Sequence, residues 1–381
     1  MNTFTRKLKH FIQKETVLSV AFMLAVVSSL IVTPDHAYLS YIDWNTLLLL
    51  FSLMAVMAGF QKLGIFKAAG NKLLSKTSNT RQLLLILVFL PFFFSMLITN
   101  DVALITFVPF AIIVLRLSEQ KQLLVPLVVL QTIAANLGSM MTPMGNPQNL
   151  YLYAKSGMSI TAFLRLMFPY TFAAGLCLLA AILILKKDSL AALNLSTDFL
   201  SGTDTKNNIS RLVCFCIGFA LCLLCVAKVL APIAAAAVIL LYLLATDRPL
   251  LKKVDYSLLG TFICFFVFIG NMGRIEGFCT LLETLITGHE RIVAVLSSQV
   301  ISNVPAALLL SGFTDKFNEL IVGTNLGGLG TLIASMASLI SYKQITQEYP
   351  ELKRNYFVCF TISNIVMLVI LLLISVIPSK I

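Results

Sequence analysis

Apolar stretches of about 15 to 25 residues, separated by short polar segments, follow one another along the whole chain. A helix needs about 20 predominantly apolar residues to cross the hydrocarbon core of a bilayer. The pattern therefore predicts an all-α polytopic membrane protein with about 9–11 transmembrane segments. The predicted spans are 17–33, 44–60, 122–155, 160–185, 211–230, 232–246, 257–272, 315–343 and 356–378.

Two further apolar stretches, 83–116 and 291–313, are interrupted by polar residues in their middle. In the first, Thr99, Asn100 and Asp101 separate two arms of about 15 residues, each roughly 22 Å long as a helix. Such arms are shorter than the hydrocarbon core of about 30 Å. We therefore expect re-entrant helical hairpins, with a kinked pair of helices that crosses twice as the open alternative.

A second kind of interruption lies in the predicted span 122–155, where Gly, Pro and Asn gather at membrane depth. Gly and Pro unwind helices, and the freed backbone groups are tolerated only where protein buries them or where they line a polar cavity. We therefore expect an unwound helix beside a polar cavity. Its candidate residues are Asn136, Gly138, Ser139, Thr142, Pro143, Gly145, Asn146 and Pro147, in a polar cluster that also includes Asn149.

The second half of the chain repeats these features in the same order. The segment "IDWNTLLLLFSLMAVMAGF" from Ile42 is echoed by "VDYSLLGTFICFFVFIGNM" from Val254, and "NLGSMMT" from Asn136 by "NLGGLGT" from Asn325. The hairpin residues Thr99-Asn100-Asp101 are echoed by Ser302-Asn303-Val304. The second set of candidate site residues is Ser302, Asn303, Asn325, Gly327, Thr331 and Ser335.

An odd number of predicted crossings between the two copies inverts the second half relative to the first. We therefore predict an N-terminal helix in 1–33, inverted repeats in 34–185 and 211–381, and a polar cytoplasmic linker in 186–210. Each repeat is expected to hold a re-entrant hairpin and an unwound helix. Inverted repeats whose broken helices meet at the bilayer midplane are typical of secondary transporters.

The charge distribution fits this topology. Only 12% of residues are charged, against roughly a quarter in soluble domains, and the net charge is +11. Most Lys and Arg residues fall in the loops predicted to be cytoplasmic, whereas the loop 34–43 has none. The distribution of Lys and Arg therefore predicts that the N-terminus lies in the cytoplasm. No nucleic-acid partner is expected. The segment 63–74 is predicted to form an amphipathic interfacial helix.

Motifs of catalysis and metal binding are not found in the sequence. Cys222 and Cys225 have the CxxC spacing, but no second pair or nearby His completes a zinc site. There is no HExxH motif, no GxSxG with a partner His and no pair of intramembrane carboxylates. We therefore expect neither an enzyme nor a bound cofactor, apart from a coupling Na⁺ or H⁺.

Asp101 is the carboxylate placed most squarely inside the predicted membrane region, where such a group costs about 2.5–3.5 kcal/mol. It is predicted to couple transport to a proton or to Na⁺, with a structural cap of the hairpin turn as the alternative. A Na⁺ site is expected near Asn100, Asp101 and Asn303. Hydroxyl groups of Ser139, Thr142, Thr331 and Ser335, and the N-termini of the restarting half-helices, are expected to contact an anion.

These motifs resemble the ion transporter superfamily, which includes citrate-transporter-like permeases, divalent-anion/sodium symporters and the arsenite and sodium/proton antiporter branches. The likeness covers most of the chain, from about Ile42 to Tyr342, and is carried by "DWNTLLLLFSLMAVMAGF", "ITNDVALITFVPF", "NLGSMMTPMGNPQN", "SNVPAALLL" and "TNLGGLGTLIASMASL". It implies two hairpins and two unwound helices around the substrate, a movement that carries the site across the membrane, and often a homodimer.

The resemblance also marks a departure at the hairpin tips. The dicarboxylate branch carries Ser-Asn-Thr at both tips, whereas this chain retains only Asn100 and Asn303 in their middle position, with Asp101 and Val304 after them. That departure weakens the case for two sodium sites and a dicarboxylate. No Lys or Arg lies in the predicted site, so a neutral or weakly charged substrate or an inorganic anion stays open.

We therefore predict a secondary active transporter in the bacterial inner or plasma membrane. Its expected substrate is a small anion or organic acid, such as a citrate-like or dicarboxylate-like compound or an inorganic anion, coupled to Na⁺ or H⁺. A cation/proton antiporter or an arsenite-type efflux permease of the same superfamily is the alternative. An ion channel, which could also use broken helices and backbone-lined pores, is the third hypothesis.

Overall fold

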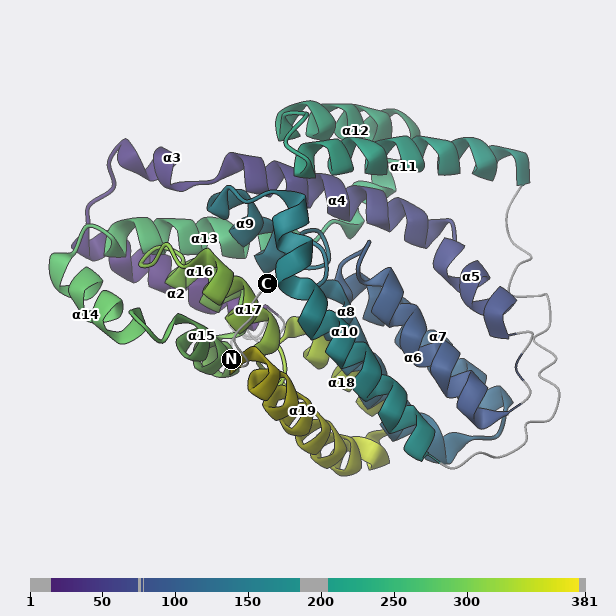
Figure 1. The fold of residues 1–381 in the computed structure, drawn as a ribbon. Helices are drawn as coiled ribbons and strands as arrows, with labels where there is room; N and C mark the ends of the chain where they lie inside the picture. Colours follow the sequence, from purple (N-terminus) through teal and green to yellow (C-terminus); the bar gives the residue numbers. More distant parts are fainter. Residues whose placement is uncertain (1–14, 75–76, 78, 186–204, 377–381) are drawn as a thin grey trace, which may run out of the picture.

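The computed structural model describes residues 15–74, 77, 79–185 and 205–376 (Figure 1). Within these ranges the chain folds into helices, and no β-strand is present. The helices of the first half are α2 (Thr16–Ile31), α3 (Ala37–Tyr41), α4 (Trp44–Lys62), α5 (Ile65–Leu74), α6 (Thr80–Phe94), α7 (Asn100–Leu117), η1 (Lys121–Leu123), α8 (Leu124–Ser139), α9 (Pro147–Ser156) and α10 (Ile160–Ile184).

The helices of the second half follow the same succession of long, short and broken elements. They are α11 (Thr205–Val226), α12 (Pro232–Thr246), η3 (Arg248–Lys253), α13 (Tyr256–Met272), α14 (Glu276–Ile286), α15 (Glu290–Ile301), α16 (Asn303–Leu310), α17 (Phe317–Leu326), α18 (Met336–Glu348), η4 (Pro350–Leu352) and α19 (Lys353–Val376).

The protein is an integral membrane protein with several membrane-spanning helices. Six helical segments in the described ranges are long and apolar enough to cross a bilayer, or seven if the bent pair α13–α14 counts as one span. Helices α2, α6 and α12 are also apolar but shorter. These shorter helices account for much of the difference from the expected 9–11 segments, so the number of full crossings stays a prediction.

The predicted elements are found close to their expected bounds. The interrupted stretches 83–116 and 291–313 are the helix pairs α6–α7 and α15–α16, and the span 122–155 breaks between α8 and α9. The span 315–343 breaks likewise between α17 and α18, and the expected interfacial segment is helix α5. Residues 186–204 of the predicted linker lie outside the described residues, and α11 begins within its last part.

The element order of the first half recurs in the second. A long helix, a short helix, a hairpin, a broken helix and a final long helix run from α4 to α10 and again from α13 to α19. The starts of α4 and α13 are built alike: the Asp43 carboxylate accepts a hydrogen bond from the Thr46 N–H (3.1 Å), and the Asp255 carboxylate one from Leu258 (2.9 Å). The inverted relation of the two halves stays a prediction.

Helices of one half also pack against helices of the other half. Helix α2 packs along α13, and α12 packs along α4 together with α11. In Figure 1, α11 and α12 lie across α4, while α2 runs beside α13. The hairpins and broken helices form the other part of the molecule, in which α8 packs against α6 and α7, and α17 packs against α15 and α16.

An arginine at the start of each hairpin fastens the last helix of its half. Arg81 donates hydrogen bonds to the carbonyl oxygens of Leu183 (2.9 Å) and Leu185 (3.2 Å) at the end of α10. Arg291 donates to the Ser375 carbonyl at the end of α19. Carbonyl groups at a helix C-terminus have no partner within the helix and favour a positive charge.

Candidate functional site

The tips of the two hairpins bind the two unwound segments in the same way. The Asn100 N–H donates to the carbonyl oxygen of Gly145 (3.1 Å), and the Asn303 N–H donates to that of Ala334 (2.9 Å). Both asparagines are the first residue of a helix, α7 and α16, where backbone N–H groups lack a helical partner. The unwound segments therefore supply hydrogen-bond acceptors for these two N–H groups, which lipid cannot provide.

A threonine from each unwound segment reaches back to the preceding hairpin arm. The Thr142 hydroxyl donates to the carbonyl of Met96, and the Thr331 hydroxyl donates to the carbonyl of Gln299 (3.1 Å). Gln299 adds a second connection, because its side chain donates to the Leu329 carbonyl at 2.9 Å. Two of the four hydroxyl groups that were predicted to contact an anion, those of Thr142 and Thr331, thus donate to backbone carbonyls within the protein.

The repeated asparagines join the two halves. The Asn136 Oδ1 accepts from the Asn100 side chain (3.0 Å) and from the Ser335 hydroxyl (3.1 Å), while its Nδ2 donates to the Ser338 hydroxyl (3.3 Å). Asn325 accepts from the Asn146 side chain at 3.0 Å. Each repeated asparagine therefore binds the beginning of the restarted helix of the other half.

The remaining polar residues of the first unwound segment complete this network. The Asn146 Oδ1 caps α9 by accepting from the Asn149 N–H (2.9 Å), and its Nδ2 also contacts the Ser139 hydroxyl (3.2 Å). The Asn149 side chain donates to the carbonyl of Thr142 (3.2 Å) and accepts from Asn325. Asn149 belongs to the polar cluster from which the cavity was predicted, and its place three residues after Asn146 is that of a capped N–H.

The predicted glycines act by close packing. A methyl group on Gly138 would lie 2.0 Å from the Phe92 carbonyl oxygen, and one on Gly327 would lie 2.6 Å from the Ser298 hydroxyl oxygen. A methyl group on Gly145 would lie 2.0 Å from the Ser139 carbonyl oxygen. Gly138 and Gly327 thereby let the broken helices approach the hairpins, and Gly145 lets the unwound segment pack against the end of α8.

The prolines act on the backbone at the restart of α9. Pro147 is the first residue of the helix, where its missing N–H costs nothing, and Pro143 lies within the break between α8 and α9. The second hairpin tip carries strain instead, because Ser302 has φ of 74°, a conformation that favours glycine. Its hydroxyl contacts the Ala334 carbonyl at 3.4 Å.

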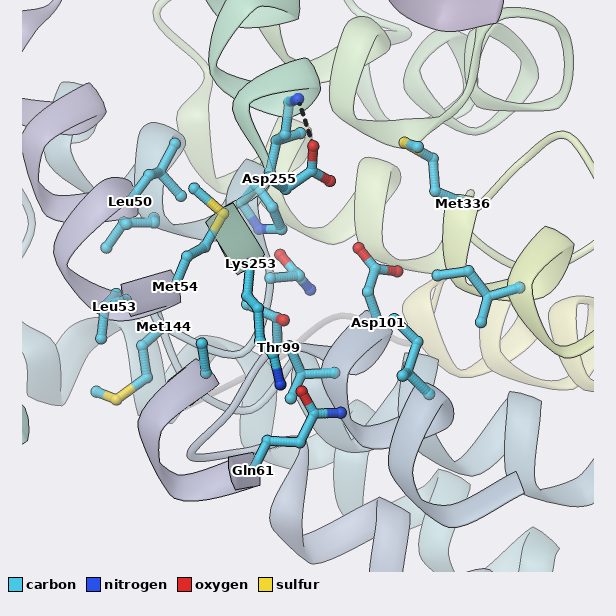
Figure 2. A pocket seen from close by; sticks show the side chains of 18 residues that line it. Leu50, Leu53, Met54, Gln61, Thr99, Asp101, Met144, Lys253, Asp255 and Met336 are labelled. Carbon is cyan, nitrogen blue, oxygen red and sulfur yellow. Dashed lines mark hydrogen bonds between the residues drawn. The ribbon is translucent and has the colours of Figure 1, made fainter. Parts of the chain in front are cut away.

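A cavity of about 160 Å³ lies against one end of this network (Figure 2). Thr99 and Asp101 reach it from the start of α7, Asn146 and Pro147 from the start of α9, and Met336 from the start of α18. The remaining wall comes largely from apolar side chains of α4, including Leu50, Leu53 and Met54. Three helix N-termini, each carrying a partial positive charge, therefore meet at one cavity.

Asp101 is the predicted residue with the clearest place in this cavity. Its Oδ1 is buried and has no hydrogen-bond partner among the residues that the structure describes. The Asp101 N–H donates to the Asn100 Oδ1 at 3.0 Å, so Asn100 satisfies this N–H in the first turn of α7. A buried carboxylate oxygen without a partner is the arrangement expected of a group that takes up a cation.

The structure does not gather the whole predicted Na⁺ site around the cavity. Asn100 uses its side chain toward Asn136 and Asp101, and Asn303 is not among the residues that line the cavity. No group of three or more His, Cys, Asp or Glu residues suited to a metal ion is found in the described part of the chain. A Na⁺ site therefore stays a prediction.

The predicted site residues include no Lys or Arg, but the cavity beside them is lined by a lysine. Lys253, at the end of η3, lines the cavity, as do Asp255 and Gln61 (Figure 2). Lys253 lies in the short loop between two predicted spans and directly follows Lys252, so the sequence pattern marks both only as cytoplasmic charges. The fold brings one of them back over the cavity, which no local pattern indicates.

Comparison with known proteins points to transport. A family model described as "Citrate transporter" matches residues 12–316. An uncharacterized transporter from Methanocaldococcus jannaschii is 32% identical over 86% of this chain and 87% of its own. The inner membrane protein YbiR from Escherichia coli is 29% identical over 79% and 80% of the two chains. The silicon efflux transporter LSI3 from Oryza sativa subsp. japonica is 33% identical over 36% of this chain and 28% of its own.

Proposed function

Because the chain belongs to the citrate transporter family, we propose that it is a secondary active transporter of a small anion or organic acid, coupled to Na⁺ or H⁺. The site is the cavity at the starts of α7, α9 and α18, and the pocket alternates between the two sides of the membrane. The protein resides in the inner or plasma membrane with its N-terminus in the cytoplasm, as the distribution of Lys and Arg favours.

The observation that carries this proposal is the unpartnered Asp101 oxygen beside three helix N-termini. Helix N-termini attract an anion, whereas an ionised Asp101 repels it in a site of low dielectric constant. A proton or a Na⁺ ion on Asp101 removes this repulsion. Binding of the coupling cation therefore favours binding of the anion, and each is carried with the other.

The Asp101→Asn variant tests the coupling. In proteoliposomes with an imposed proton or Na⁺ gradient, we expect it to lose gradient-driven accumulation, because the amide binds neither cation as a carboxylate does. Exchange of labelled for unlabelled substrate without a gradient should remain. The matched control is Asp315→Asn, an exposed carboxylate away from the cavity. Accumulation by Asp101→Asn at the wild-type level would contradict the coupling role.

An efflux permease for a small, weakly charged oxyacid is a second candidate. Most of the cavity wall is apolar, and Lys253 is the single cationic side chain among its described lining residues. A partial relative is named a silicon efflux transporter. Silicic acid and arsenite belong in the same proteoliposome assay, where transport of these solutes and not of carboxylates would favour the second candidate.

A further inference from the structure

Three charged side chains line the cavity, and they have different partners. Asp255 caps helix α13 by accepting from the Leu258 N–H at 2.9 Å. Asp101 has an unpartnered oxygen, as described above. Lys253 forms no ion pair with any residue in the described ranges. The cavity is therefore lined by a capped carboxylate, a carboxylate with a buried oxygen that has no partner, and a solvent-exposed ammonium group without an ion pair in the described structure.

The two groups stand on different walls. Lys253 comes from η3, and its side chain extends toward Gln61, whereas Asp101 comes from the start of α7 on another side of the cavity (Figure 2). They form no salt bridge with each other in the described structure, and Lys253 is exposed, so water screens their attraction. A separation of this kind leaves room for a ligand between them.

The position of Lys253 is not a requirement of the repeated fold. In the pairing of Ile42 with Val254, the equivalent residue of the first half is Tyr41. Tyr41 accepts a hydrogen bond from Arg274 at 3.3 Å and adds no cation of its own. The lysine is thus a feature of one half only, as expected of a residue that contacts the substrate.

On the basis of the proposed transport function, we infer that Lys253 binds the anionic group of the substrate and that this substrate is a small monovalent anion. Once a cation neutralises Asp101, and the N-terminus of α13 offsets part of the charge of Asp255, Lys253 is the cationic side chain of the described lining that can pair with an anion. Leu50, Leu53, Leu258 and Ile340 provide an apolar wall for the rest of the molecule. A multivalent anion would bring further charges beside this wall, where the described lining offers no second cationic side chain to pair with them.

Transport of a charge series by the full chain in proteoliposomes tests this inference. Labelled lactate, succinate and citrate are compared at neutral pH under proton and Na⁺ gradients, with silicic acid as the uncharged solute. We expect lactate to be accumulated best. Lys253→Gln should raise its half-saturation concentration about tenfold or more, the loss of one hydrogen bond to a charged group, while changing the maximal rate less. Lys253→Arg should stay within about threefold of wild type.

Lys252→Gln is the matched control, since both lysines are exposed but only Lys253 lines the cavity. It should keep the wild-type half-saturation concentration. Gel filtration in detergent checks that each variant is folded. If Lys253→Gln is not folded, the half-saturation concentration of Lys253→Arg is the measurement that tests the inference. The inference is overturned if succinate, citrate or silicic acid is the preferred solute, or if the half-saturation concentration for lactate is the same in Lys253→Gln as in wild type. If the wild type accumulates none of these solutes under any gradient, the proposed function itself falls.

Discussion

Asn136 and Asn325 occupy matching places in the two halves of the chain, and each binds the helix that restarts in the other half. Asn136 contacts Ser335 and Ser338 before and within α18, and Asn325 contacts Asn146 and Asn149 before and within α9. The two broken helices are therefore held to each other by side-chain amides within the buried interior. Their position relative to the cavity depends on these contacts.

Removal of one of these amides should destabilise the protein. Asn136→Ala leaves the Asn100 side chain and the Ser335 hydroxyl without their shared acceptor, at a cost of about 1–3 kcal/mol. We expect a lower thermal unfolding midpoint in detergent and loss of transport. The exposed Asn318 is the matched control, and Asn318→Ala should stay within about 0.5 kcal/mol of wild type. Equal midpoints for the two variants would show that the amide contacts do not carry stability.

A methyl group at Gly138 should disrupt the packing of α8 on the first hairpin. The nearest atom is the Phe92 backbone oxygen at 2.0 Å, which cannot move aside as a flexible side chain can. Gly138→Ala should therefore cost at least about 1–3 kcal/mol. Gly277→Ala in α14 meets nothing within 4 Å and should stabilise by up to about 1 kcal/mol through helix propensity. Thermal unfolding of both variants checks the pair, and destabilisation by Gly277→Ala alone would refute it.

Relief of the strained residue at the second hairpin tip should increase stability. Ser302 has φ of 74°, so Ser302→Gly should gain about 1 kcal/mol, less the small loss of its long contact to Ala334. Thr99, at the equivalent tip, has φ of −68°, and Thr99→Gly should cost about 0.4–1 kcal/mol through the unfolded chain. Chemical or thermal denaturation measures both, and shifts of the same sign would argue against strain at Ser302.

The ion pair of Asp35 and Arg274, which lies outside helices α2 and α13, should make stability depend on acid pH. The hydrogen bond from Arg274 (2.8 Å) is the first cause that lowers the pKa of Asp35 below its ordinary value of 3.8. A lowered pKa in the folded state stabilises above the ordinary value, and this contribution is lost as pH falls through the folded pKa.

We expect the unfolding midpoints of wild type and Asp35→Asn to differ slightly at neutral pH, because both partners are exposed, and to converge below about pH 4. Arg274→Gln should remove the same pH dependence. Unfolding midpoints between pH 7 and pH 3 measure the effect. A difference that stays constant over this range would rule out the carboxylate as its source.

The sequence allowed the breaks in the helices to be predicted, because Gly, Pro and Asn at membrane depth leave few alternatives. Asn100, Asn136 and Asn325 are in one buried network for that reason. The direction of individual hydroxyl bonds could not be predicted: Thr142 and Thr331 turn toward backbone carbonyls of their own hairpins. The sequence identifies which side chains can donate a hydrogen bond, but the packing of the helices determines which acceptor lies nearest to each donor.

Lys253 illustrates a second limit. Lys252 and Lys253 are adjacent residues of the same type on the same predicted side of the membrane, yet Lys253 lines the cavity and Lys252 does not. The difference depends on how η3 leads into α13, which is set by contacts with α4 and α12 from distant parts of the sequence. Hydrophobic periodicity carries no information on such contacts.

Helix α4 is synthesised long before its partner α12, and α2 is synthesised long before its partner α13. An N-terminal half released before the second half is synthesised would expose the faces of α2 and α4 that pack against α13 and α12 in the complete protein. Chaperones, proteases or other nascent chains would have access to these faces. Completion of assembly is thereby deferred until the later half has entered the bilayer. Two fragments split in the region between α10 and α11 and produced together should reunite, since each one supplies the surface that the other lacks.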